Sequence, residues 1–120
     1  MATPEIIHVS YDGCLQRTVT EDGTAKNLST ATKISIEFYD DPGTAIAEFN
    51  TTDDAANFSN TLASGIIKFL WTSSTFTAYL ASLIDTGKFR GRHNARIIIY
   101  DATYANGYVV HDPFVVEFRR

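Results

Sequence analysis

Residues 32–39, TKISIEFY, carry the pattern that most restricts how this chain can fold. Every second residue is apolar, which is the period of a strand that buries one face; the buried set is Ile34, Ile36 and Phe38. The strand stops at Asp-Asp-Pro-Gly, residues 40–43, whose proline and glycine suit the two central positions of a type II turn. TAIAEFN, residues 44–50, then returns as a second strand. A β-hairpin over residues 32–50 is therefore predicted.

Short strand patterns recur along the rest of the chain. GIIKFLW, residues 65–71, alternates and directs three side chains toward a core: Ile67, Phe69 and Trp71. IIIY, residues 97–100, is a short apolar run that suits a strand buried on both faces. A loop closing on Asn106-Gly107, a frequent hairpin dipeptide, leads into the alternating strand FVVEF, residues 114–118. Two weaker strand patterns lie at residues 6–10 and 15–20.

One segment has a helical period instead. Its apolar residues fall three and four positions apart, on one face of a helix: Phe76, Tyr79, Leu80, Leu83 and Ile84. Ser73 or Ser74 can cap its start, and Gly87 suits a left-handed C-terminal position. We expect one short amphipathic helix at about residues 74–85. Residues 51–64 are polar and weakly patterned, which predicts a loop with room for one helical turn.

About seven short strands and one helix predict a mostly β protein, most economically an antiparallel β-sandwich. The 120 residues suffice for one domain with its own core, so residues 1–120 are expected to form a single domain. Residues 1–27 leave two alternatives open. They pair within this domain, or they form an arm that pairs with a neighbouring copy.

The net charge of −4 argues against a general nucleic-acid binder, so no nucleic-acid partner is expected. The charge is unevenly distributed along the chain. Residues 1–60 carry ten acidic and three basic side chains, and residues 61–120 carry four acidic and seven basic ones. If these charges also separate in space, copies of the chain can pack by charge complementarity, and we expect self-association. The alternative is that the strand topology mixes the two halves on one surface.

The segment KFRGRHNAR, residues 88–96, is the one basic cluster. In an extended backbone its alternate residues line one face, which predicts a docking strip for an acidic protein surface. A solvated strand face is the equally weighted alternative. The polar loop 51–64 is the second expected contact surface. The residues predicted to contact partner proteins are Lys88, Arg90, Arg92, Arg96, Asp53 and Asp54.

Residues with catalytic or metal-binding chemistry are sparse. Neighbours on a strand point to opposite faces, so His111 and Asp112 are not expected to act as a pair, and no nucleophile motif accompanies them. The histidines lack the spacing of zinc ligands, and Cys14 is the only cysteine. We therefore expect no enzyme, no metal and no cofactor. No apolar run approaches the roughly 18 residues of a membrane span, and the N-terminal sequence lacks signal-peptide character, so we expect synthesis in the host cytoplasm and no membrane partner.

About 90 residues resemble a pattern found in small virion proteins of tailed bacteriophages, including the N-terminal domain of upper baseplate proteins. The matching segments are Leu28-Ser29-Thr30-Ala31-Thr32 followed by KISIEFYDDPGT, then Gly65-Ile66-Ile67-Lys68-Phe69, and finally Gly87-Lys88-Phe89 with IIIYDATYANGYVVHDPFVVEF. The helical character of residues 72–86 departs from the shorter connection of that pattern. The resemblance implies an Ig-like sandwich without a catalytic centre, present in many copies on a virion.

The expected function is accordingly a non-enzymatic accessory protein of a virion, which decorates the capsid or belongs to the neck, tail or baseplate. Its expected partners are the major capsid protein or tail and baseplate proteins. Two other functions compete with it. A carbohydrate-binding β-sandwich would stack sugar rings on Tyr104 and Tyr108, and a hydrolase would use His111 or His93.

Overall fold

The hairpin expected at residues 32–50 forms the centre and one edge of a six-stranded sheet. The computed structural model describes residues 4–40, 44–84, 92–110 and 113–120. Strand β5 (Lys33–Asp40) pairs antiparallel with β6 (Thr44–Asn50), which confirms the hairpin. The pairing shifts by a bulge between Phe38 and Tyr39. The predicted turn at residues 41–43 lies outside the described residues.

Four further strands complete this sheet, in the order β1-β10-β8-β5-β6 with β9 paired to β8. They are β1 (Glu5–His8), β8 (Arg92–Tyr100), β9 (Tyr108–Val109) and β10 (Phe114–Arg119). All pairs in the sheet are antiparallel except one: β1 runs parallel to β10. The predicted antiparallel pairing therefore holds for the other pairs of this sheet but not for β1 with β10, because the alternation of a single strand does not reveal its direction.

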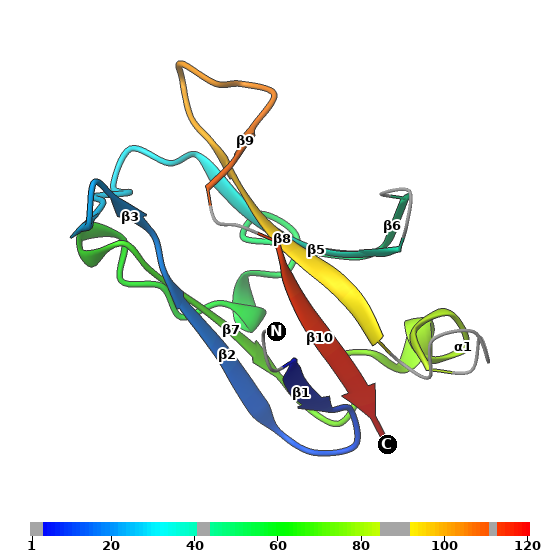
Figure 1. Cartoon of the computed structure of the whole chain (residues 1–120). Helices are drawn as coiled ribbons and strands as arrows, with labels where there is room; N and C mark the ends of the chain where they lie inside the picture. Colours follow the sequence, from blue (N-terminus) through cyan, green and yellow to red (C-terminus); the bar gives the residue numbers. More distant parts are fainter. Residues whose placement is uncertain (1–3, 41–43, 85–91, 111–112) are drawn as a thin grey trace.

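A two-stranded sheet faces the first across the core. It pairs β2 (Gly13–Thr18) with β7 (Ile66–Trp71) in antiparallel register. In Figure 1 these two strands lie across the molecule from β5 and β8. A small hairpin of β3 (Thr20–Glu21) and β4 (Thr24–Ala25) extends from the end of β2. The described chain therefore has seven strands of four or more residues and three of two residues, and it is mostly β as predicted. An Ig-type connectivity stays a prediction.

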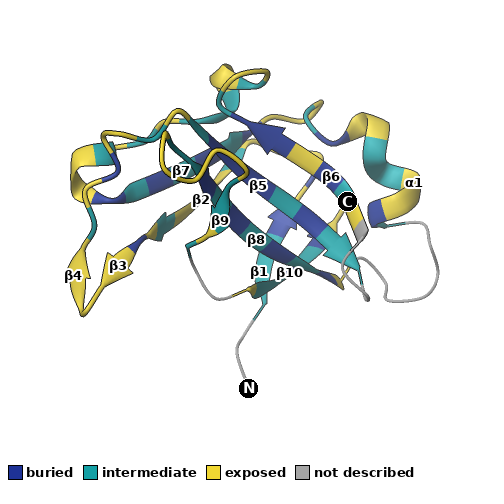
Figure 2. Ribbon diagram, turned by 90° about the horizontal axis from the view of Figure 1, so that it is seen from above, coloured by how far each residue is buried: buried dark blue, intermediate teal, exposed yellow. Residues whose placement is uncertain are grey.

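The core between the sheets is built from the side chains that the alternating patterns placed there. Its larger part is rich in phenylalanine, and Phe38, Phe69, Phe76 and Phe118 are each 1% exposed or less. A second cluster fills the other end, with Ile34, Ile67, Ile97 and Ile99 among its buried members. Figure 2 shows buried and intermediate residues alternating along β8. The expectation that residues 97–100 are buried on both faces was wrong, because Ile98 and Tyr100 face outward and are only half-buried.

The helical segment is shorter than the predicted 74–85. It consists of a 3₁₀ turn, η3 (Thr77–Tyr79), followed by α1 (Leu80–Leu83). Phe76 and Leu83 are fully buried, so the predicted apolar face is confirmed. The helical segment begins later than predicted because a side-chain hydroxyl group binds the backbone just before it. The backbone N–H of Thr72 donates to Oγ1 of Thr75 at 2.8 Å. Gly87 lies outside the described residues.

Residues 51–64 hold two 3₁₀ turns, η1 (Ala55–Asn57) and η2 (Leu62–Ser64), where one helical turn was expected. The stretch between them runs along the second edge of β7. Bridges join Phe58 to Phe69 and Thr61 to Ile66. This loop is therefore a cover for one edge of the small sheet as well as a surface segment.

The N-terminal residues pair within the chain in the described structure. β1 joins the six-stranded sheet beside β10, and β2 joins β7. Exchange of residues 1–27 between copies in an assembly stays a prediction.

Candidate interaction surface

The outward face of the six-stranded sheet carries several polar side chains that are paired with one another. Because alternate residues of a strand point to opposite faces, the core positions of β5 and β8 leave the intervening residues directed away from the core. These outward positions include Lys33, Glu37, Tyr39, Arg92, Arg96, Ile98, Tyr100 and Glu117. Most of them are half-buried rather than fully exposed.

Arg96 lies in the middle of this outward face and is held from two sides. Its Nε donates to Oε1 of Glu37 on the neighbouring strand at 2.6 Å. Its guanidinium carbon lies 4.3 Å from the ring centroid of Tyr39. The side chains of Arg96 and Glu37 are 27% and 13% exposed, so solvent screens this pair only in part. The two contacts hold the guanidinium between Glu37 and Tyr39.

A second cation lies on a ring at one end of the same face. The Nζ of Lys33 is 4.2 Å from the ring centroid of Tyr100, which is its cross-strand partner. Such a contact is favourable because the electron-rich face of the ring attracts the ammonium group.

Glu117 organises the opposite end of the outward face. Its carboxylate accepts hydrogen bonds from Nε of Arg92 at 3.0 Å and from the guanidinium of Arg119. These charge-assisted bonds hold the pKa of Glu117 below its usual value. Glu117 is 13% exposed, while both arginine side chains are more than half exposed. The carboxylate thus anchors two cations that remain accessible to a partner.

Apolar side chains lie between these charged groups. Ile98 and Val115 are half-buried, and Val109, opposite Ile98 on β9, is 52% exposed. Ser35 is buried beneath the face, and its hydroxyl has no hydrogen-bond partner among the described residues. A face whose charged side chains are already fixed loses less side-chain entropy when a second protein docks on it.

The structure places the predicted basic residues as follows. Arg92 and Arg96 share the outward face of β8, as the alternation predicted, and each forms an ion pair with a carboxylate of its own chain. Lys88 and Arg90 lie outside the described residues. The described part of the predicted basic strip, Arg92 and Arg96, is therefore a surface in which positive groups are paired with negative ones.

The predicted acidic residues have a local structural role. Asp54 accepts a hydrogen bond from the backbone N–H of Asn50 at 3.0 Å, and Asp53 accepts one from the side-chain amide of Asn50 at 3.2 Å. The Oδ1 of Asn50 in turn accepts bonds from the N–H groups of Thr52 and Asp53. These contacts close the turn after β6. Asp53 is exposed and Asp54 is half-buried, so both remain accessible at its surface.

The structure does not bring the acidic and basic positions together. Asn50 lies opposite Ser35, and Ser35 lies opposite Ile98. Arg92 is six residues from Ile98 along β8, which is about 20 Å at the usual rise of a strand. Arg92 and the acidic turn therefore lie toward opposite ends of one sheet, and Arg96, two residues from Ile98, lies between them.

His93 is a buried side chain with both ring nitrogens beside oxygen atoms. Its Nε2 lies 2.7 Å from the carbonyl oxygen of Leu83, and its Nδ1 lies 3.2 Å from Oδ1 of Asp40. A carbonyl oxygen only accepts, so Nε2 carries a proton. These contacts tie the end of α1 and the end of β5 to β8, and they leave no ring nitrogen directed at solvent. His111 and Asp112 lie outside the described residues.

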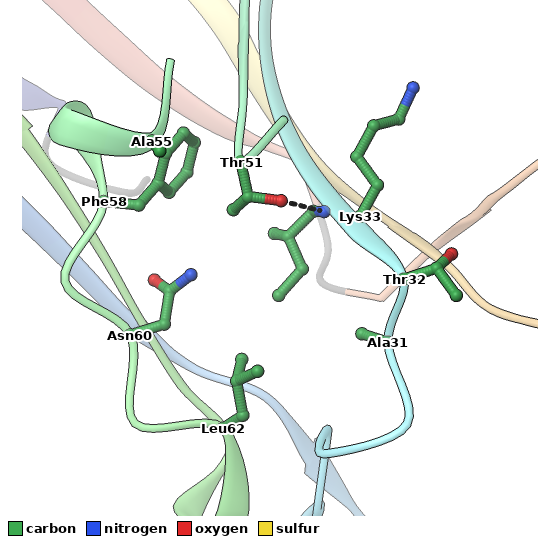
Figure 3. A pocket seen from close by; sticks show the side chains of 9 residues that line it. Ala31, Thr32, Lys33, Thr51, Ala55, Phe58, Asn60 and Leu62 are labelled. Atoms are coloured by element: carbon green, nitrogen blue, oxygen red, sulfur yellow. Dashed lines mark hydrogen bonds between the residues drawn. The ribbon is translucent and has the colours of Figure 1, made fainter. Parts of the chain in front are cut away.

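Two surface hollows have different chemistry. The hollow in Figure 3, of about 270 Å³, lies between the start of β5 and the loop that covers β7. Across it the N–H of Ile34 donates to Oγ1 of Thr51 at 3.1 Å. Lys33 is the one charged residue in its lining, and Figure 3 shows its side chain pointing away from the hollow. It offers no acid or base to a bound molecule.

The second hollow, of about 110 Å³, is polar and contains the two tyrosines singled out from the sequence. The rings of Tyr104 and Tyr108 are 4.8 Å apart, and Tyr104 is 55% exposed. Lys26 and Asp101 also line the hollow, and the Nζ of Lys26 lies 5.2 Å from the ring centroid of Tyr108.

Among residues 4–40, 44–84, 92–110 and 113–120, no three His, Cys, Asp or Glu side chains gather closely enough to hold a metal ion. The helices in the described part of the chain are too short to cross a bilayer.

The sequence predicted which residues of β5 face outward, but not which residues of β8 they contact. The alternation of Lys33, Ser35 and Glu37 with apolar residues predicted an outward face, but it did not predict the partners of these residues on β8. Those partners depend on strand register, which the local pattern does not carry. Glu117 stood out only as the charged residue in an apolar strand.

Comparison with models of known protein families and with curated proteins gave no match. Function is therefore inferred from the surface of the chain itself.

Proposed function

We propose that this chain is a non-enzymatic structural accessory protein of a tailed-bacteriophage virion, which docks on the assembled particle. The docking surface is the outward face of the six-stranded sheet. The observation that carries the proposal is the pre-ordered set of ionic and cation–ring contacts on that face, centred on Arg96 with Glu37 and Tyr39.

Three properties of the outward face support protein docking. It alternates paired charges with the accessible apolar groups Ile98, Val109 and Val115, which is the mixture found in specific interfaces. Its charged groups are held by neighbouring strands, so little ordering is needed on contact. Its centre lies on a rigid sheet rather than on a loop.

The resemblance to small virion proteins supports the choice of partner. Its matching segments coincide with the β5–β6 hairpin, β7, and the β8–β9–β10 region. A protein that binds only the assembled particle stabilises it by mass action. The partners are then the major capsid protein, for a decoration protein, or tail and baseplate proteins.

Immunogold electron microscopy of purified particles, with antibody raised against this chain, tests the location. Label over the shell identifies a decoration protein, and label at the neck or tail tip identifies a connector or baseplate module. Absence of this chain from purified particles, checked by immunoblotting after denaturation so that buried epitopes are counted, contradicts the proposal.

Particles prepared without this protein provide the test of the docking face. Lys33→Glu is expected to weaken rebinding of the added protein, measured by cosedimentation, because it replaces the cation on Tyr100 with an anion. Lys68→Glu is the matched control, since Lys68 is a half-buried lysine on the opposite sheet. Equal rebinding of both variants would move the docking site elsewhere.

A carbohydrate-binding module is the second candidate, favoured by the Tyr104–Tyr108 pair beside a polar hollow. Sugar rings stack on exposed aromatic faces while hydroxyl groups bond to polar neighbours, here Lys26 and Asp101. Binding to a glycan panel that Tyr104→Ala abolishes would support this function. Tyr11→Ala is the control, because Tyr11 is also an exposed tyrosine, at 68%, but lies away from the hollow.

A further inference from the structure

The two edges of the small β2–β7 sheet differ in whether their backbone groups have hydrogen-bond partners. Along the free side of β7, the N–H groups of Ser59 and Thr61 donate to the carbonyls of Lys68 and Ile66 at 2.9 Å. The N–H of Lys68 is itself satisfied by Oδ1 of Asn60 at 2.9 Å. The edge of β7 is therefore covered by its own chain.

Along β2, successive residues direct their backbone N–H and C=O groups to alternate sides of the strand. The N–H of Val19 donates to the carbonyl of Gly65, which continues the ladder on the β7 side. Because successive residues of a strand direct their backbone groups to opposite sides, Arg17 and Leu15 also face β7. The backbone N–H and C=O groups of the intervening residues point to the other side: Cys14, Gln16 and Thr18.

The register with β7 gives the same assignment independently. Thr18 lies opposite Ile66 and Gln16 lies opposite Lys68. Ile66 and Lys68 direct their backbone groups to the loop 59–61, away from β2, so these are pairs without mutual hydrogen bonds. Their partners on β2 must then point outward as well. In the described part of the chain, no backbone group bonds to the N–H groups of Cys14, Gln16 or Thr18 on that side.

Of the features that usually block strand addition, this free edge of β2 has one: Nη1 of Arg17 lies 3.0 Å from the outward-pointing carbonyl oxygen of Gln16. Natural edge strands are protected by charged side chains, prolines, bulges or short length. Edge strand β6 carries the exposed Glu48 beside a bulged pairing, and edge strand β1 has only four residues. In contrast, the exposed side chains of β2 are neutral: Cys14, Gln16 and Thr18.

We propose that the free edge of β2 is a self-association site, where β2 of a second copy pairs antiparallel across a two-fold axis at Gln16. In this register Gln16 faces Gln16 of the second copy, and Cys14 faces Thr18. Three facing pairs each exchange two backbone hydrogen bonds, about six in total. Two β2–β7 sheets then become one four-stranded sheet.

A second copy is the occupant because the edge complements itself. Its facing side chains are neutral and polar, so a two-fold pairing sets no like charges opposite each other. Arg17 is the nearest cation, and it is occupied within the chain: its Nη1 lies 3.0 Å from Oε1 of Glu5 and 3.0 Å from the carbonyl oxygen of Gln16. A carbonyl oxygen accepts two hydrogen bonds, so the Gln16 carbonyl still has one acceptor direction for the second copy. The site is independent of the virion role.

Charge reversal at the two-fold axis tests both the site and its register. The wild-type chain is expected to form dimers in sedimentation equilibrium as its concentration rises. Gln16→Lys and Gln16→Glu each place like charges opposite each other and should raise the dimer dissociation constant by up to about fivefold. An equimolar mixture of the two variants should recover dimers, as heterodimers. Circular dichroism of each variant alone verifies that the fold is kept.

A cysteine at the same position gives a second readout. Directly opposed residues in a hydrogen-bonded antiparallel pair have Cα atoms about 5.5 Å apart, within disulfide reach. Cys14→Ser combined with Gln16→Cys should therefore form a disulfide-linked dimer on mild oxidation, and the wild-type chain, whose Cys14 faces Thr18 in this register, should not. A wild-type chain that stays monomeric up to about 1 mM, or a dimer insensitive to both charge variants, overturns the inference.

Discussion

Gly65 shows how one residue can decide whether two segments meet. It ends η2 with a positive φ of 69°. A Cβ atom at this position would lie 2.5 Å from the carbonyl oxygen of Lys26 and 2.8 Å from that of Val19. Both neighbours are backbone, so neither can rotate away. Glycine is required here because β2, β7 and the chain after β4 converge on one point.

Gly65→Ala should lower the free energy of unfolding by more than about 2 kcal/mol, since it adds a backbone clash to the strain of a left-handed residue. Gly23→Ala is the matched control: Gly23 also has a positive φ, of 81°, but a Cβ atom there would have no neighbour within 4 Å. Its expected cost is about 1 kcal/mol. Urea denaturation of both variants measures the difference, and equal costs would show that the close approach is unimportant.

Glu117 links stability to pH through the two arginines that bond to its carboxylate. Its pKa is lowered in the folded chain, so the charged form stabilises the fold above the usual carboxyl range. That contribution is lost as the pH falls through the lowered value. Wild type should therefore exceed Glu117→Gln in unfolding free energy at pH 7, and the gap should close toward pH 3. A gap that stays constant over this range would show that charge is not its cause.

At the scale of elements, the loop that covers β7 depends on side chains as well as backbone. Asn60 accepts the N–H of Lys68 through Oδ1, and the side-chain amide of Asn57 donates to the carbonyl of Leu70 at 2.9 Å. The loop thus supplies a partner to each of these two backbone groups of β7. A polar sequence without a strand pattern takes the place of a third strand here.

Asn60→Ala should cost about 1 kcal/mol of unfolding free energy, because it leaves the N–H of Lys68 without its acceptor. Asn60→Asp keeps an acceptor oxygen at the same place and should remain close to wild type. Chemical denaturation distinguishes the two. Equal destabilisation by both variants would mean that the bond to Lys68 is not what the side chain contributes.

The elements that could be predicted were those whose pattern is local. Alternation located β5, β7 and β10, and helical spacing identified Phe76 and Leu83 as buried. The helix boundary was missed because Thr75 competes for the backbone at residue 72. For the interaction surface, alternation put Arg96 on the outward face, but Glu37, 59 residues away, became its partner only through the register of two strands. Neither alternation nor composition records that register.

At the scale of the whole molecule, strand order mixes the acidic and basic halves of the sequence. The basic strand β8 lies between β5, from the acidic half, and β10. The ion pair of Arg96 with Glu37 joins the two halves directly. The acidic and basic halves of the sequence were expected either to separate in space or to mix on one surface. At the centre of this sheet they mix.

The same strand order predicts an order of local stability. β8 is hydrogen-bonded on both sides, by β5 and β10, whereas β3 and β4 pair only with each other and are exposed. In hydrogen exchange of a dilute sample, the amides of β8 should be the slowest and those of β3 and β4 among the fastest. Exchange at similar rates in both regions would contradict this order.

The parallel pairing of β1 with β10 has a mechanical consequence. In parallel strands the start of one and the end of the other lie at opposite ends of the pair, so tension applied at Glu5 and Arg119 pulls the two strands lengthwise past each other. All hydrogen bonds between them are then loaded together in shear rather than opened one by one like a zipper. Tension between Glu5 and Arg119 should therefore meet the resistance of the whole β1–β10 pair at once.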